Sequence, residues 1–153
     1  MIKLKMQFAD GLEPINSQFV GKVVRELNKT LPDASDGIVN IRVTSALEVK
    51  DLNQRYAGRP QDTDVLSFNY REGGPLLSQE IGDVIVSYDH VIKQAKATQT
   101  DEMTELALLI LHGMLHIMGY DHQSKVDQQT MNDLQATVMA NAGLTYRDFA
   151  WKE

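Results

Sequence analysis

The chain has 153 residues, a length typical of one globular domain, and we expect residues 1–153 to form a single domain. Hydrophobic residues make up 42% and charged residues 24% of the chain, which excludes the disordered and fibrous classes. The net charge of −6 argues against a protein that coats nucleic acid through a general basic surface, and the absence of cysteine excludes disulfides and thiolate metal sites.

The beginning of the chain predicts a strand followed by a helix. Residues 2–8 (IKLKMQF) alternate apolar and polar positions, as in a strand with one buried face. This opening lacks the apolar run of a signal peptide, and no segment approaches the roughly 18 apolar residues of a membrane span, so we expect a cytoplasmic protein. Residues 17–31 place apolar side chains at helical spacing, after Ser17 as a candidate N-cap and before Pro32, which ends the helix.

A second strand and a short helix come next. Residues 38–44 (IVNIRVT) are β-branched and alternating, which favours a strand. Leu47, Leu52 and Tyr56 recur in a polar background and predict a helix over residues 47–56.

Two further strands are separated by turn-rich segments. Gly58 and Pro60 break the chain before residues 65–69 (VLSFN), which predict the third strand. A glycine and proline loop at residues 73–75 precedes residues 81–87 (IGDVIVS), whose apolar run is typical of a central strand.

The rest of the chain predicts helices. These cover residues 88–98, 101–118 and 125–142, and Gly143 is a suitable stop for the last one. The element order predicts an α/β (α+β) fold in which a mixed four-stranded sheet is covered by about five or six helices.

Three of the four histidines lie in the segment HGMLHIMGYDH, residues 112–122. His112 and His116 are four residues apart, so on a helix their side chains share one face within reach of a single metal ion. Gly119 can adopt the left-handed conformation that ends a helix, which lets His122 return toward the same ion. Three neutral imidazoles leave one tetrahedral position for water, as in a catalytic zinc site, although nickel, copper or iron would also accept these ligands.

The spacing of these histidines is that of the long zinc-peptidase motif, and the helix that carries them is therefore zincin-like. Gly113 replaces the glutamate that serves as general base in that motif. The residues therefore predict a metal hydrolase with chemistry other than efficient peptide hydrolysis, and a zinc peptidase or amidase is the weaker alternative.

Three motifs in the same order resemble the YbeY endoribonucleases, bacterial zinc proteins of about this length. HGMLHIMGYDH agrees with the family signature HGxLHxxGYDH at each fixed position, and TDVLSF (63–68) and IGDVIVS (81–87) resemble the two strand motifs of the family. The resemblance implies an endoribonuclease with one Zn²⁺ per chain, held by His112, His116 and His122. It implies cleavage of single-stranded RNA, especially the 3′ end of small-subunit ribosomal RNA, in ribosome quality control. The implied partners are RNA and ribosomal particles, with neither a membrane nor DNA.

One segment departs from the family pattern. The family commonly reads YRGKDxPTDVLSF, whereas this chain reads YAGRPQDTDVLSF, so Ala57 stands where the family has an arginine. Arg59 and Arg55 are candidates for the positive charge that stabilises a reacting phosphate, and we take Arg59 as the catalytic candidate.

An alternative from another class is a ribosome-associated binding or assembly factor whose metal only stabilises the fold. Three histidine ligands with an open position weigh against a purely structural metal.

Overall fold

The computed structural model describes residues 1–12, 16–32, 36–59, 61–74 and 78–149. Within these ranges the chain forms four strands, five α-helices and one short 3-10 helix. In chain order they are β1 (Ile2–Phe8), α1 (Gln18–Thr30), β2 (Gly37–Thr44), α2 (Ala46–Ala57), β3 (Val65–Asn69), η1 (Tyr70–Gly73), β4 (Glu80–Ser87), α3 (Tyr88–Thr98), α4 (Glu102–Ile117) and α5 (Lys125–Asn141). The predicted break at Pro60 and the end of the predicted loop at Pro75 lie outside the described residues.

The four strands form one mixed sheet in the order β1-β2-β4-β3. β1 and β4 both pair with β2 in parallel, and β3 pairs with β4 antiparallel. Each predicted strand is present, and β4 occupies an inner position, which agrees with its continuous apolar run. The predicted fold class, a mixed four-stranded sheet covered by helices, is confirmed.

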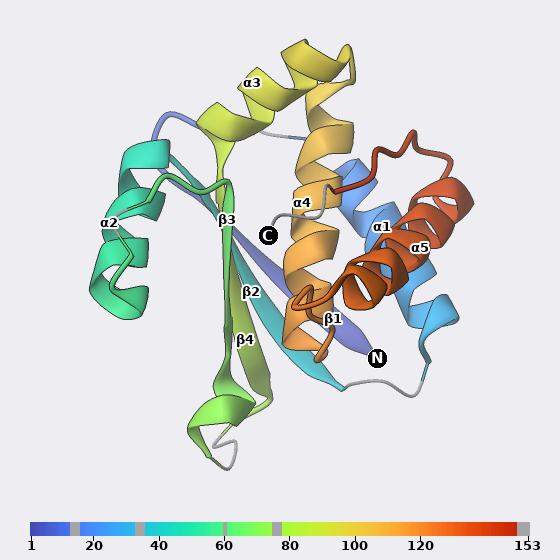
Figure 1. The fold of residues 1–153 in the computed structure, drawn as a ribbon, viewed down its shortest axis with the longest axis horizontal. Helices are drawn as coiled ribbons and strands as arrows, with labels where there is room; N and C mark the ends of the chain where they lie inside the picture. The colour runs from blue at the N-terminus through green and yellow to red at the C-terminus, as the bar shows by residue number, and fades with distance from the viewer. Residues whose placement is uncertain (13–15, 33–35, 60, 75–77, 150–153) are drawn as a thin grey trace.

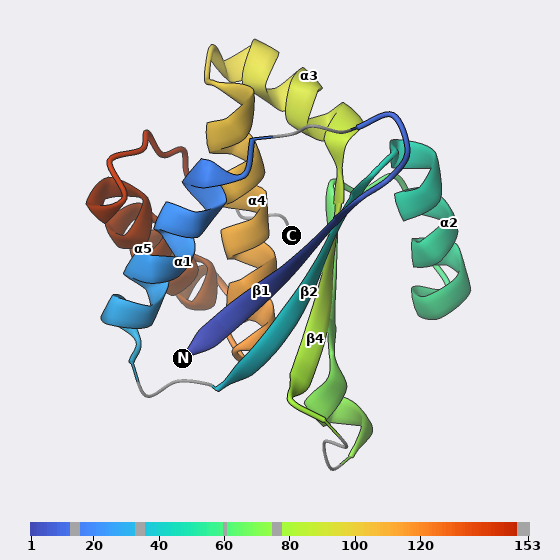
Figure 2. The same ribbon diagram turned by 180° about the vertical axis from the view of Figure 1, so that it is seen from behind.

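The helices lie on both faces of the sheet. Figures 1 and 2 show α1, α4 and α5 on one side and α2 on the other. α4 contacts β3, β4 and the three helices α1, α3 and α5, and its residues from Thr104 to Leu115 are all buried. A helix that is apolar on every side requires such surroundings. None of the described helices combines the length and the apolar character needed to cross a lipid bilayer.

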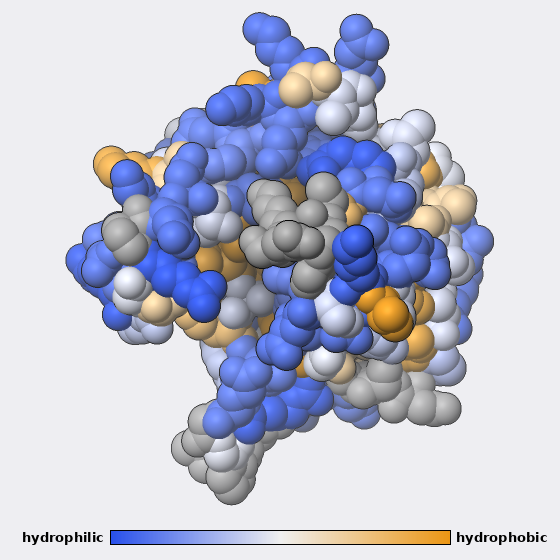
Figure 3. Space-filling model, in the orientation of Figure 1, coloured by the Kyte–Doolittle hydropathy of each residue, from blue (hydrophilic) through white to orange (hydrophobic). Residues whose placement is uncertain are grey.

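α2 forms as predicted, but the side chains that it buries differ from those that predicted it. Leu47 and Tyr56 are 79% and 69% exposed, whereas Val49 and Asn53 are buried. A hollow of about 470 Å³ lies between α2 and the sheet, lined in part by Tyr56 and Phe68. Figure 3 shows this face of the molecule as mostly hydrophilic, with apolar atoms recessed beside α2. α2 therefore covers its face of the sheet incompletely.

The segment after α5 returns across α4 and is attached by a buried ion pair. The Arg147 guanidinium donates to the Glu105 carboxylate, with 3.2 Å between Nε and Oε2, and Glu105 is only 1% exposed. Arg147 also donates to Gln94 Oε1 at 2.9 Å. A carboxylate so deeply buried in α4 needs its cation, so this contact holds the C-terminal segment in place.

Arg147→Met should lower the free energy of unfolding by about 3 kcal/mol, because the Glu105 carboxylate would stay buried without a cation. The double variant Glu105→Gln/Arg147→Met should lose less, since it removes both charges. Urea unfolding followed by circular dichroism gives the comparison. Equal midpoints for Arg147→Met and the wild type would contradict the structural role of the pair.

Candidate metal centre

The C-terminal end of α4 has the hydrogen bonds of a Schellman motif. Met118 caps the helix, and Gly119 follows with a φ of +100°. The Gly119 N–H donates to His116 O at 3.1 Å, and the Tyr120 N–H donates to Leu115 O at 2.9 Å. This pattern requires a left-handed residue at Gly119, as predicted, and it reverses the chain so that the next residues lie beside the helix.

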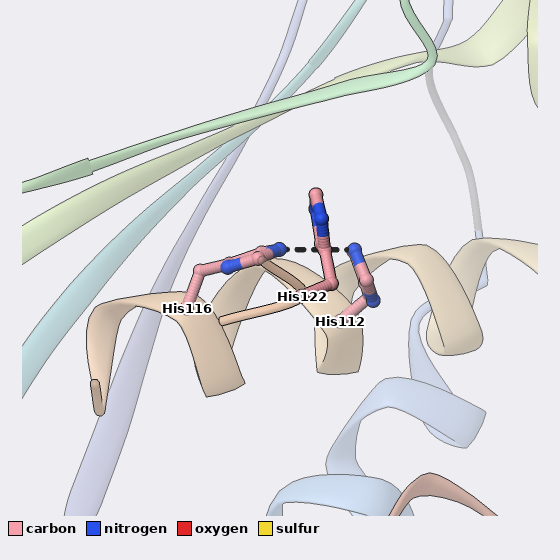
Figure 4. Close-up of side chains that lie close together, drawn as sticks. All are labelled: His112, His116 and His122. Atoms are coloured by element: carbon pink, nitrogen blue, oxygen red, sulfur yellow. Dashed lines mark hydrogen bonds between the residues drawn. The ribbon is translucent and has the colours of Figure 1, made fainter. Parts of the chain in front are cut away.

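His122 returns to the two histidines of α4 as predicted. His112, His116 and His122 each place a ring nitrogen within 4.8 Å of the others. Figure 4 shows the three rings close together, and the dashed line joins Nε2 of His112 to Nε2 of His116 at 3.1 Å. His112 is buried, His116 is half-buried and His122 is exposed. The cluster therefore opens to solvent on the His122 side.

The protein holds both α4 imidazoles through Nδ1. His116 Nδ1 lies 3.0 Å from Tyr120 O, and a carbonyl oxygen can only accept, so this nitrogen carries the hydrogen. His112 Nδ1 lies 2.7 Å from Gln135 Oε1, which accepts in the same way. Burial, with a smaller contribution from neighbouring His116, lowers the pKa of His112 to about 4, and burial also lowers the pKa of His116. Both rings are therefore neutral near pH 7, and both direct a bare Nε2 into the cluster.

These residues fit a metal ion. Two neutral Nε2 atoms facing each other at 3.1 Å are both acceptors, and they repel unless a cation lies between them. Two nitrogen ligands on a tetrahedral zinc ion are separated by about 3.3 Å, which follows from Zn–N bonds of about 2.05 Å. The cluster formed by His112, His116 and His122 could therefore bind a metal ion.

A small polar cavity adjoins the cluster. It has a volume of about 210 Å³ and is lined by Ser67 and Asn69 of β3 together with His116, Tyr120 and Asp121, among others. The Asp121 carboxylate also accepts from the His122 N–H at 2.7 Å. A ligand of the metal could enter from this side, next to β3.

The two candidate arginines lie elsewhere. Arg59 follows α2, where it is exposed and its backbone N–H donates to Asn53 O at 3.3 Å. Arg55 is on α2 and pairs with Asp51 at 3.2 Å. Neither arginine lines the cavity beside His116, so the structure assembles the histidines without either one.

The fourth histidine, His90, is outside the cluster. Its Nδ1 lies 2.6 Å from Ser87 Oγ, and its Nε2 lies 3.1 Å from Asp62. Ser87 also accepts from the His90 N–H and so caps α3. His90 thus has a role at the helix terminus.

The sequence did not predict the two residues that orient the His112 ring. Gln135 comes from α5, and the Phe149 ring stacks on the His112 ring with 4.2 Å between centroids. Neither residue belongs to a sequence motif that predicts contact with His112. The hydrogen bond and the stacking contact arise when α5 and the C-terminal segment pack on α4.

Comparison with known proteins found relatives that share one name. A relative from Picosynechococcus named endoribonuclease YbeY is 38% identical over 125 residues, which cover 78% of this chain and 77% of the relative. A relative of the same name from Persephonella marina is 32% identical over 133 residues and covers 86% of each chain. The solution structure of a Thermotoga maritima protein has a TM-score of 0.57 at 26% identity, covering 92% of this chain and 90% of that one. The family model described as endoribonuclease YbeY matches residues 8–143, and the chain therefore belongs to the YbeY endoribonuclease family.

Proposed function

We propose that this protein is a zinc-dependent endoribonuclease that cleaves single-stranded RNA, with the 3′ end of small-subunit ribosomal RNA as its substrate and ribosome quality control as its wider role. The observation that carries the proposal is the convergence of His112, His116 and His122 within 4.8 Å, in a chain whose relatives are named endoribonucleases. A nitrogen-only ligand set favours zinc among the divalent metals.

The zinc ion, when bound, would polarise a phosphate oxygen and activate a water molecule for attack on phosphorus. The protein orients the histidine rings that would bind the ion. His112 and His116 stay neutral and present Nε2, because each Nδ1 hydrogen is already donated to an oxygen. The cavity beside β3, which His116 lines, would give the substrate a route to the cluster.

The structure disfavours a peptidase. At residue 113 a Cβ atom would meet Val84 Cγ1 of β4 at 2.6 Å, so the helix faces the sheet there. The glutamate of the peptidase motif would enter the core at this position, and no general base could come from it. An assembly factor with a purely structural metal is also disfavoured, because three nitrogen ligands leave a coordination position open.

Arg59 is the residue that we propose for binding the phosphate. Among the described residues Arg59 forms no ion pair, whereas Arg55 is already paired with Asp51. Arg59→Ala should therefore lower kcat/KM by roughly tenfold or more, the value of a lost charged hydrogen bond, while Arg55→Ala should change it less than about twofold. Steady-state cleavage of one RNA by both variants makes the comparison. Equal rates for the two variants and the wild type would remove arginine from the mechanism.

Ribosomal particles are the proposed site of action, in the cytoplasm. The net charge of −6 gives little general attraction for phosphate, so docking on a particle should contribute more than affinity for bare RNA. Tight, salt-sensitive binding to naked RNA of any sequence would contradict this part of the proposal.

The test uses protein purified without a histidine tag. Metal analysis should find one zinc per chain. A single-stranded RNA that ends in the small-subunit 3′ sequence should be cleaved, and the same strand in a duplex should resist. Removal of metal with a chelator should stop cleavage, and added Zn²⁺ should restore it. Cleavage that continues unchanged in metal-free protein would indicate a contaminating nuclease and would overturn the proposal.

A further inference from the structure

His112 is connected to the C-terminal segment by a chain of buried hydrogen bonds that begins at Gln135. The Gln135 side chain is 0% exposed, and its Oε1 accepts from His112 Nδ1 at 2.7 Å. Its Nε2 donates to Tyr146 Oη at 3.1 Å, and the Tyr146 hydroxyl donates to Asn132 Oδ1 at 3.0 Å. Each polar side-chain group in this series of hydrogen bonds has a partner, so the network can keep these side chains in one arrangement.

Backbone groups of Phe149 determine which atoms donate and which accept along this series of hydrogen bonds. A backbone N–H can only donate and a backbone carbonyl can only accept. The Phe149 N–H donates to Asn132 Oδ1 at 3.1 Å, and Asn132 Nδ2 donates to Phe149 O at 3.0 Å. These two bonds orient the Asn132 amide, so the Tyr146 hydroxyl must donate to it. Toward Gln135 the hydroxyl can therefore only accept, so Gln135 Nε2 donates to it. Gln135 Oε1 is then the atom that faces His112. His112 must in turn carry its hydrogen on Nδ1.

The same segment covers the His112 ring. Phe149 stacks on it at 4.2 Å with 16° between the ring planes. The Arg147 guanidinium lies 4.9 Å from the Phe149 ring centroid and is also paired with buried Glu105. The stacking contact limits rotation of the imidazole, and the hydrogen bond selects its tautomer.

We propose that Gln135 is a positioning residue for the metal, and that Asn132 and the C-terminal segment Tyr146–Phe149 hold it so that His112 presents a bare Nε2. This inference deepens the proposed function and rests on the cluster being the metal site of the enzyme. Groups that orient a metal-binding histidine in this way typically contribute 10–100-fold to metal affinity.

The test measures zinc affinity and the His112 tautomer in the full chain, apart from RNA cleavage. Gln135→Met keeps an unbranched side chain of similar length but removes the acceptor, and it should weaken Zn²⁺ binding by about 10–100-fold in competition with a chromophoric chelator. Gln135→Glu keeps an acceptor toward Nδ1 and should bind Zn²⁺ within about threefold of the wild type or more tightly. Gln129→Met is the matched control, since Gln129 is exposed on the same helix and its side chain donates to Asp133, and it should leave the affinity unchanged.

Long-range proton–nitrogen NMR spectra of the metal-free protein give a second measurement. Wild-type His112 should carry its hydrogen on Nδ1, and Gln135→Met should shift the population toward Nε2–H. A wild-type His112 protonated on Nε2 would overturn the inference even if Gln135→Met failed to fold, as would equal zinc affinity for Gln135→Met and the wild type. Zinc binding without RNA cleavage by the wild type would overturn the proposed function but leave the role of Gln135 intact.

Discussion

His116→Ala should lower the rate of RNA cleavage about a thousandfold, because a metal ion supplies several kcal/mol of transition-state stabilisation and its binding needs this ligand. The variant should still fold. Alanine is the best helix former, and the substitution also removes one of the two acceptors that face each other at 3.1 Å. Added Zn²⁺ should therefore raise the Tm of the wild type but not that of His116→Ala. Single-turnover cleavage and thermal unfolding, with and without Zn²⁺, measure both effects.

His90→Ala is the control for this prediction. His90 is the one histidine outside the cluster, and its ring bonds Ser87 and Asp62. The His90→Ala variant should retain the wild-type cleavage rate, and Zn²⁺ should still raise its Tm. If His116→Ala cleaved RNA as fast as His90→Ala, the histidine cluster could not be the catalytic centre.

Gly113→Glu, which restores the peptidase glutamate, should lower the free energy of unfolding by more than about 5 kcal/mol and prevent stable folding. A Cβ atom at residue 113 would lie 2.6 Å from Val84 Cγ1 and 3.0 Å from Val84 Cγ2. Val84 is fully buried in β4 and β-branched, so it cannot move aside easily. The charged end would also enter an apolar core. Gly113→Ala adds only the Cβ and should cost about 1–3 kcal/mol, measured by urea unfolding in the presence of a chelator.

Gly21→Ala is the matched control, since Gly21 is also a helical glycine. Its Cβ would meet nothing within 4 Å, and the position is exposed on α1. This substitution should stabilise the protein by about 0.5–1 kcal/mol, because alanine loses less backbone entropy in a helix. Equal unfolding midpoints for Gly113→Ala and Gly21→Ala would show that the close approach of α4 to β4 is not needed for stability.

Helix α2 shows what a local sequence pattern predicts and what it does not. The spacing of Leu47, Leu52 and Tyr56 indicated the helix correctly, since propensity and turn chemistry act over a few residues. It did not indicate which side chains would be buried: Val49 and Asn53 are buried, whereas Leu47 and Tyr56 are exposed. The face that a helix buries depends on where its partners lie, and for α2 these are β4, β3 and α3.

The histidine cluster was predictable from residues 112–122 because its geometry is local. Four residues along a helix place two side chains on one face, and a glycine at a helix end reverses the chain. The Gln135 hydrogen bond, the Phe149 stacking contact and the approach of Gly113 to Val84 join segments far apart in the chain. No short-range spacing encodes such contacts, since they form only when α4 is packed between the sheet and α5. The local pattern thus specified which atoms can bind a metal, and long-range packing selected the tautomer, the burial and the access of that site.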